Sequence, residues 1–159
     1  MSGCFEDPVY FDEIRDILLS KLAPKHPLLE KNRKMMQDIQ KTNSVCLSVR
    51  RGDFESNADV KKLQSVCDRQ YFEAAIKAIK KNIENPVFFM FSDDIEWVKN
   101  NIHIECVTYY EDGTDPVWEK LRLMSACKHF IVSNSTFSWW TQYLSTNENK
   151  VCRIAKSLV

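Results

Sequence analysis

Glycine is scarce in this sequence, with Gly3, Gly52 and Gly113 the only three among 159 residues. A glycine-rich dinucleotide fingerprint and a Walker loop both need closely spaced glycines, because the backbone there must approach phosphate groups. Three isolated glycines exclude both motifs. A nucleophile elbow and the paired histidines of a zinc-protease helix are missing too. Any nucleotide site in this chain must therefore be built from other residues.

Long apolar runs and an excess of charge of one sign are also missing. No stretch approaches the roughly 20 apolar residues of a membrane span, and residues 1–7 lack the basic start and apolar stretch of a secretory signal. Lysine plus arginine equals aspartate plus glutamate at 22 each, so no overall field draws the chain to nucleic acid. We expect a cytoplasmic protein that binds no nucleic acid, with peripheral association at the inner membrane face left open.

The sequence also lacks the spacings of a metal site. His26, His103 and His129 are scattered, and no two of the six cysteines are spaced as in a zinc knuckle or redox motif. Asp93 and Asp94 are adjacent rather than separated as metal-binding carboxylates usually are. We therefore expect packed, reduced thiols and neither a bound metal nor a cofactor.

Short apolar runs alternate with helical stretches along most of the chain. At 159 residues and 44% hydrophobic composition, one sizeable core is expected. Strands alternating with helices are typical of a parallel sheet with right-handed crossovers and helices on both faces. We predict an α/β, Rossmann-like domain at residues 44–159 after a helical lead-in at 1–43. The predicted strands are 45–49, 87–91, 104–109, 130–132 and 151–155, and the predicted helices are 8–23, 25–39, 72–83, 94–100, 115–127 and 136–144.

Polar clusters follow four of the predicted strands. They occupy residues 50–53, 92–94, 109–115 and 133–136. In a parallel sheet, ligands bind in the crevice beyond the carboxyl ends of the strands, where loops and helix N-termini point outward together. The sequence therefore predicts that these four segments face one crevice.

Arg50 and Arg51 suit a diphosphate. A guanidinium stays charged and offers planar, forked donors to phosphate oxygens. Neighbouring side chains at a strand end diverge, so one arginine is expected to face the ligand and the other to pair with a carboxylate such as Asp53. The alternative is an ordinary exposed ion pair, which is common and worth about 0 to 1 kcal/mol.

Two helix starts can be recognised. Asp93 is expected to cap the next helix, with Glu96 completing a capping box. As an alternative, a carboxylate at this edge would accept hydrogen bonds from a guanine or a ribose. Asp115 and Pro116 resemble an N-cap and a first-turn proline, which would turn Val117 inward.

The segment after the fourth predicted strand joins that strand to a helix. Its hydroxyls, together with the unpaired amides of the first helical turn, would cradle a phosphate. The alternative is that Ser135 caps the helix while Phe137 and Trp140 pack in the core. Only the small polar residues support the functional interpretation.

With these residues in view, the chain resembles glycosyltransferase family 11, the alpha-1,2-fucosyltransferases, and in particular its short bacterial members. The likeness is carried by residues 45–54 (VCLSVRRGDF), 87–98 (VFFMFSDDIEWV) and 115–144 (DPVWEKLRLMSACKHFIVSNSTFSWWTQYL). The last block is highly specific for this family, whereas other fucosyltransferase families share the arginine pair.

The resemblance implies the donor-binding half of a GT-B enzyme, which transfers fucose from GDP-fucose to a galactoside hydroxyl with inversion and without a metal. The family's arginine pair binds the donor phosphate, a role that carries to Arg50. Its acidic turn matches Asp93 or Asp94, and these three residues are the catalytic candidates. The implied donor-binding residues are Arg50, Arg51, Asp53, Ser92, Asn134, Ser135 and Thr136.

Two departures from the family pattern bear on function. Family members often have histidine two residues before the arginine pair, where this sequence has Ser48. They also usually run to nearly twice this length, so the resemblance implies a chain truncated on its N-terminal side and at its extreme C-terminus. The expected partners are a nucleotide sugar and a galactose-containing glycan. The alternative is a non-catalytic, GDP-sugar-binding or partner-binding remnant, whose exposed apolar surface would favour self-association.

Overall fold

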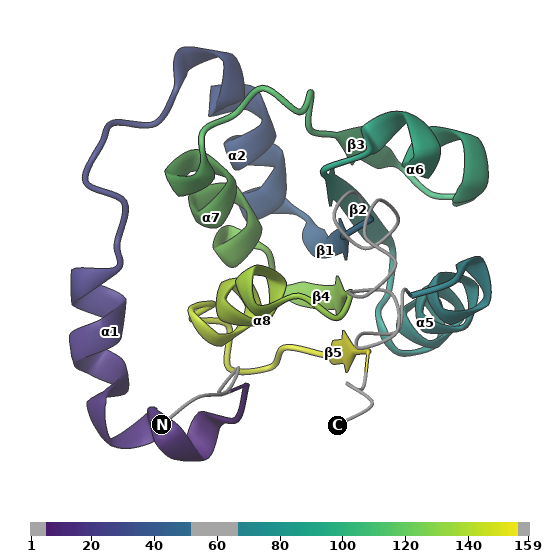
Figure 1. The fold of residues 1–159 in the computed structure, drawn as a ribbon. Coiled ribbons are helices and arrows are strands. Elements are labelled where there is room, and N and C mark those ends of the chain that lie inside the picture. The colour runs from purple at the N-terminus through teal and green to yellow at the C-terminus, as the bar shows by residue number, and fades with distance from the viewer. Residues whose placement is uncertain (1–5, 52–66, 156–159) are drawn as a thin grey trace.

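The computed structural model describes residues 6–51 and 67–155. Within them, five parallel strands form one sheet in the order β3-β2-β1-β4-β5 (Figure 1). The Rossmann-like fold predicted from the sequence is confirmed. The strands are β1 (Asn43–Val49), β2 (Pro86–Ser92), β3 (Thr108–Tyr110), β4 (His129–Val132) and β5 (Cys152–Ile154).

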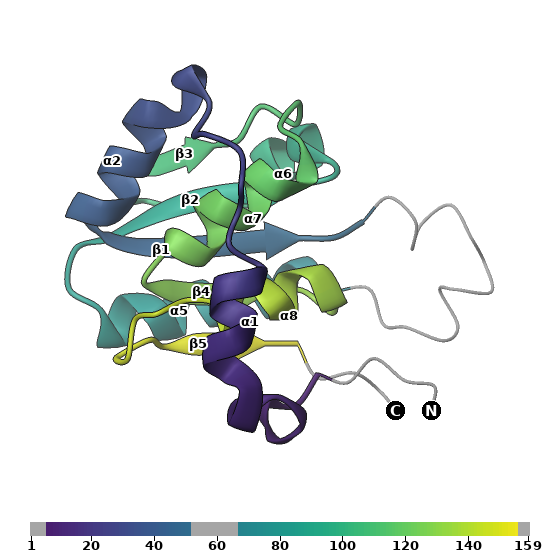
Figure 2. The same ribbon diagram turned by 90° about the vertical axis from the view of Figure 1, so that its left-hand side faces the viewer.

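Helices cover both faces of this sheet, as Figures 1 and 2 show. One face carries α5 (Arg69–Asn82) and α6 (Ile95–Asn101). The other face carries α2 (Arg33–Lys41), α7 (Val117–Ala126) and α8 (Thr136–Tyr143). In the described part of the chain, no helix combines the length and the apolar composition needed to span a membrane.

Alternate residues of the central strands face the two helical layers. Val45 and Leu47 of β1 pack with residues of α5 and α6, whereas Cys46 packs with residues of α2 and α7. In β2, Phe88 faces the layer of α5 and α6, and Phe89 faces the layer of α2 and α7; all five residues are buried. Burial on both faces explains why β1 and β2 are continuous apolar runs in the sequence.

The N-terminal segment differs from the two long helices predicted for it. Instead, 3-10 turns interrupt both stretches: η1 (Pro8–Tyr10) and η2 (Asp12–Ile14) precede α1 (Arg15–Lys21), and η3 (Glu30–Asn32) precedes α2. The proline at residue 27, which has no amide hydrogen, lies in the non-helical connection. Of the predicted lead-in, α2 packs on the sheet with Met36 and Ile39 in the core. The division at residue 43 stays a prediction.

The start of α7 also differs from its prediction. Pro116 occupies the N-cap position, and Asp115 makes other contacts: its Oδ2 accepts a hydrogen bond from Asn32 Nδ2 at 2.8 Å. Val117, expected to face inward, is 68% exposed. The cause is a buried polar network, in which the fully buried Glu119 accepts a hydrogen bond from Asn32 Nδ2 at 3.2 Å. This network orients α7 in place of the predicted apolar stripe.

Candidate functional site

The site residues gather where the order of the sheet reverses. From β1 the chain runs outward to β2 and β3, and it then returns to place β4 on the other side of β1. The loops that leave two such strands turn to opposite faces, which opens a crevice at the carboxyl ends. The amide of Arg50 donates to Ser133 Oγ at 3.1 Å, and the amide of Ser133 donates to the carbonyl of Ser48 at 3.0 Å. The structure therefore brings the arginine pair and the 133–136 turn to one edge.

Arg50 lies at the surface of this edge. Its side chain is 38% exposed, and Nη1 lies 3.2 Å from Asp93 Oδ2. The other carboxylate oxygen of Asp93 accepts a hydrogen bond from the amide of Arg51 at 2.9 Å. Asp93 therefore holds both the backbone and one side chain of the arginine turn. Asp53, the partner suggested by the sequence, lies outside the described residues.

Arg51 points the other way and is only 8% exposed. Its guanidinium carbon lies 3.6 Å from the centre of the Trp97 ring on α6. Burying a cation costs free energy, and the electron-rich face of an indole offsets part of that cost. The two arginines diverge as the sequence predicted. Trp97 was not among the predicted site residues, since nothing in the sequence links α6 to the arginine turn.

The acidic turn after β2 is held by its own hydrogen bonds. Asp94 caps α6, accepting from the amide of Trp97 at 3.0 Å, and its own amide donates to Ser92 Oγ at 2.9 Å. The predicted cap by Asp93 is therefore wrong by one residue. Arg50 and the amide of Arg51 engage the Asp93 carboxylate, which leaves its neighbour to start the helix. The predicted capping box does not form.

The turn after β4 leads into the N-terminus of α8. Ser135 occupies the N-cap position, but its side chain makes no capping hydrogen bond, so the simple capping interpretation is wrong. Asn134 is 8% exposed, and its buried Nδ2 has no hydrogen-bond partner within the described residues. Thr136 donates from Oγ1 to Glu6 Oε1 at 2.8 Å. A carboxylate therefore lies at a helix start, where the helix dipole favours negative charge.

Ser48, the departure from the family pattern noted in the sequence, is buried. Its hydroxyl lies 2.7 Å from that of Ser138 in the first turn of α8. This hydrogen bond ties β1 to α8 beneath the crevice. In this chain the side chain at position 48 therefore faces the helix.

Three carboxylates lie together beyond β3, in the loop at residues 111–115. The ammonium of Lys31 lies 3.0 Å from Asp112 Oδ2 and 2.8 Å from Asp115 Oδ1. Hydrogen bonds from Thr114 and then from Lys31 lower the pKa of Asp112 to about 2, while Asp115 and Asp112 raise the pKa of Lys31. A lysine thus supplies the cation for this cluster.

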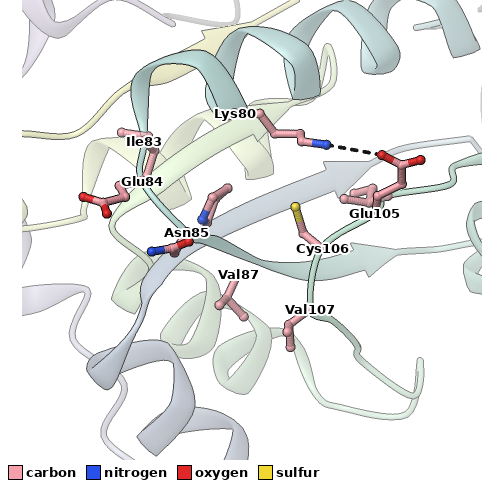
Figure 3. A pocket seen from close by; sticks show the side chains of 10 residues that line it. Lys80, Ile83, Glu84, Asn85, Val87, Glu105, Cys106 and Val107 are labelled. Atoms are coloured by element: carbon pink, nitrogen blue, oxygen red, sulfur yellow. Dashed lines mark ion pairs between the residues drawn. The ribbon is translucent and has the colours of Figure 1, made fainter.

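A hollow lies at the opposite edge of the sheet, beside the start of β2 (Figure 3). Its walls come from the end of α5, from the turn before β2 and from residues 104–107. Lys80 and Glu105 face each other across it, with 3.8 Å between Nζ and Oε2. The hollow contains none of the predicted site residues.

A parallel sheet wound with helices on both faces defines a Rossmann-like α/β protein. The chain belongs to glycosyl transferase family 11, whose family model matches residues 1–157.

Several similar proteins are named as sugar transferases. An Escherichia coli alpha-1,2-colitosyltransferase is 36% identical over 147 residues, which is 89% of this chain and 50% of that protein. The O-antigen biosynthesis glycosyltransferase WbnK, also from Escherichia coli, is 30% identical over 157 residues, or 92% of this chain and 51% of that protein. Human galactoside alpha-(1,2)-fucosyltransferase 1 is 33% identical over 104 residues, 64% of this chain and 28% of that protein. The chain thus spans about half the length of the bacterial relatives.

Solved structures share the fold. A structure of POFUT1 with GDP matches with a TM-score of 0.55 at 13% identity, covering 89% of this chain and 49% of that one. A structure of POFUT1 with GDP-fucose matches with a TM-score of 0.54 at 14% identity, covering 89% and 50%. At this level of identity the likeness concerns the fold alone.

Proposed function

We propose that this chain supplies the donor-binding half of a GT-B enzyme that transfers fucose from GDP-fucose to a galactoside hydroxyl. The reaction would be that of an inverting galactoside 2-alpha-L-fucosyltransferase. The observation that carries the proposal is the 3.1 Å hydrogen bond from the backbone amide of Arg50 to Ser133 Oγ, which brings the arginine turn beside the turn before α8. A cationic side chain and a helix N-terminus at one sheet edge suit a diphosphate.

The residues at this edge offer complementary donors. Arg50 presents a partly exposed guanidinium, and the first-turn amides of α8 have no intrahelical acceptors. The Nδ2 group of Asn134, buried and without a partner among the described residues, would gain an acceptor if a phosphate approached after a small rearrangement. Ser92, Ser135 and Thr136 complete the proposed donor site, to which the sequence also assigned Asp53, and Arg51 supports it from the side of α6.

Catalysis in this proposal is mainly electrostatic. As the bond between fucose and GDP breaks, negative charge grows on the departing diphosphate. A preorganised clamp of Arg50 and helix amides would stabilise that charge, and the loss of one such donor elsewhere costs about 3 to 4 kcal/mol. Asp93 and Asp94 were candidates for a catalytic role, but their contacts favour holding the turn. The proposal assigns no general base.

The names of similar proteins support a sugar transfer of this type. One relative is named a colitosyltransferase and others galactoside fucosyltransferases, and the solved structures that share the fold were determined with GDP or GDP-fucose. Fucose as the sugar and a galactose-containing acceptor are our proposals for this chain. A cytoplasmic location, peripheral membrane association and self-association stay predictions.

A second candidate is a non-catalytic protein that binds a GDP-sugar or a partner. Two observations favour it: the chain spans about half of its bacterial relatives, and Ser48, the departure from the family pattern noted in the sequence, is engaged by Ser138. Incubation with GDP-fucose and lactose separates the two functions. Fucosylated lactose supports the transferase, whereas GDP binding without product supports the second candidate.

Calorimetry with GDP, ADP and UDP tests the donor site itself. We expect a preference for GDP, and Arg50→Ala should weaken GDP binding about 10- to 100-fold, because charge-assisted hydrogen bonds to phosphate are lost. The GDP affinity of Arg50→Lys should lie between those of the parent chain and Arg50→Ala, since lysine keeps the positive charge but lacks the forked guanidinium donors. The control is Arg33→Ala, which removes an exposed arginine paired with Glu30 on the helical layer. Stronger binding of ADP or UDP, or normal GDP binding by Arg50→Ala, would contradict the proposal.

Transfer without a metal can be tested in the same assay. The three-carboxylate cluster beyond β3 already surrounds Lys31, whose ammonium takes the place that a cation would need. We expect EDTA to leave GDP affinity and any fucosyl transfer unchanged. Loss of either on chelation, with recovery on adding Mg²⁺ or Mn²⁺, would show that a metal participates.

A further inference from the structure

Trp97 on α6 contacts the arginine turn through the side chain of Arg51. The guanidinium carbon of Arg51 lies 3.6 Å from the centre of its ring, which is the separation of a stacked pair. Trp97 is itself half-buried and packs against the apolar core shared by α5 and α6. Its amide is held by Asp94, so the ring projects from a capped helix start.

The stacking is linked to Arg50 through two further contacts. The backbone amide of Arg51 donates a hydrogen bond to Asp93 Oδ1 at 2.9 Å, and Asp93 Oδ2 lies 3.2 Å from Arg50 Nη1. A shift of Arg51 would therefore move both the backbone amide and the carboxylate that hold the neighbouring side chain. One aromatic ring, one backbone amide and one carboxylate form a continuous chain of contacts.

The direction of the side chains agrees with this linkage. Val45 and Leu47 of β1 face α5 and α6, and Ser48 faces α8. Arg51 continues the first row beyond the strand end and meets Trp97, whereas the alternate residue Arg50 pairs with Asp93 in the turn after β2. The two neighbouring arginines therefore make different contacts, one with an aromatic ring and the other with a carboxylate.

We propose that Trp97 is a positioning residue for donor binding: by stacking on Arg51 it holds the arginine turn so that Arg50 faces the diphosphate. This inference rests on the proposed function, because it assumes that Arg50 binds the donor. Trp97 itself touches no phosphate. Its contribution is the preorganisation of a charged turn, which reduces the ordering cost when the ligand binds.

The test compares five variants with the parent chain by calorimetric titration with GDP. Trp97→Leu should weaken binding about ten-fold, the order of a desolvated cation–aromatic contact. Trp97→Phe, which keeps an aromatic face, should recover most of the affinity. The matched control is Trp118→Leu on α7, which packs on the other face of the sheet from α6 and whose ring lies 5.5 Å from the Arg122 guanidinium carbon. This control should change GDP affinity less than two-fold.

A double-mutant cycle separates positioning from a general loss of structure. Arg51→Met removes the cation at similar length, and the double variant Arg51→Met, Trp97→Leu should bind GDP about as weakly as either single variant. Additive losses, or unchanged affinity in Trp97→Leu, would overturn the inference. If the parent chain itself fails to bind GDP, the proposed function has failed, and the two failures are thereby distinguished. Circular dichroism of each variant checks that it is folded.

Discussion

At the scale of single residues, Asp93 joins the two arginines into one unit. One of its oxygens accepts from the amide of Arg51, and the other pairs with Arg50. The two contacts differ in kind. The pair with Arg50 is partly exposed to water, which screens it, whereas the hydrogen bond to the amide satisfies a backbone donor that has to be paired when partly buried.

This difference predicts unequal effects for two substitutions of Asp93. Asp93→Asn keeps an oxygen for the amide of Arg51 and loses the ion pair with Arg50, so it should lower the free energy of unfolding by about 0 to 1 kcal/mol. Asp93→Ala also leaves the amide without its acceptor, which should cost about 1 to 2 kcal/mol more. Urea denaturation of both variants provides the measurement. Equal losses would mean that the hydrogen bond to the backbone contributes little.

Much of this site could be predicted from residue types and their order. The position of Arg50 and Arg51 at a strand end, and their divergence, follow from the two-residue period of a strand. Trp97 could not be found in this way, because its contact with Arg51 joins segments separated by a whole crossover helix. The shift of the cap from Asp93 to Asp94 was also hidden, since both can cap a helix and the choice depends on where Arg50 lies.

At the scale of elements, α8 connects the crevice to the N-terminal segment. Its first turn faces the arginine turn, and its far end carries the rings that hold the segment before α1. The ring of Phe11 lies with its centroid 4.8 Å from that of Trp140 and 6.1 Å from that of Tyr143. Arg15 donates to the carbonyls of Tyr143 and Ser145 at 3.2 and 3.0 Å. One short helix thus supports both the candidate site and the chain's N-terminal part.

Phe11 is expected to be the main apolar anchor of that segment. Phe11→Ala should lower the free energy of unfolding by about 1 to 2 kcal/mol, less than for a fully buried phenylalanine because the ring is only half-buried. Trypsin cleavage near Arg15 and Lys21 should become faster as the segment detaches. The control is Ile17→Ala, whose side chain on α1 is 58% exposed and should change stability by less than about 0.5 kcal/mol. Equal cleavage rates in both variants would show that Phe11 is not the anchor.

Elements with a clear periodicity were predicted well, and the irregular ones were not. The helix predicted at 72–83 appears as α5, and the apolar runs at 45–49 and 87–91 lie inside β1 and β2. Of the strand predicted at 104–109, only the end pairs in β3 (Thr108–Tyr110), and residues 104–107 instead line the hollow at the opposite end of the sheet. Apolar content alone does not distinguish a strand from an extended segment that packs beside one.

At the scale of the whole molecule, the stability of the sheet is expected to depend on the protonation of His129. This residue begins β4 and is 7% exposed. Its Nδ1 accepts a hydrogen bond from the amide of Val151, just before β5, at 3.1 Å. An imidazole that accepts at this nitrogen has to be neutral there, and burial, followed by the charge of Lys128, lowers the pKa of His129 below its ordinary value of 6.5. The hydrogen bond therefore joins two strands only while the ring is unprotonated.

The sign of the pH dependence follows from this lowered pKa. Because the unfolded chain takes up the proton more readily than the folded one, the contribution of His129 is complete above the unfolded pKa of 6.5. It should decrease as the pH falls through that value and level off below the folded pKa. Asp112 adds a separate loss of stability in acid. Its folded pKa of about 2 lies below its ordinary value of 3.8, so its contribution to stability is lost as the pH falls between those two values.

Substitutions of His129 and Asp112 test which residue causes each part of the pH dependence. His129→Asn supplies a side-chain oxygen for the amide of Val151 but does not titrate, so its free energy of unfolding should vary less than that of the parent chain between about pH 7 and about pH 5. Asp112→Asn should leave that range unchanged and flatten only the dependence below about pH 4. Urea denaturation at half-unit pH steps measures both. A parent-like slope in His129→Asn would place the titrating group elsewhere in the chain, and the neutral imidazole would then not be what ties β4 to the start of β5.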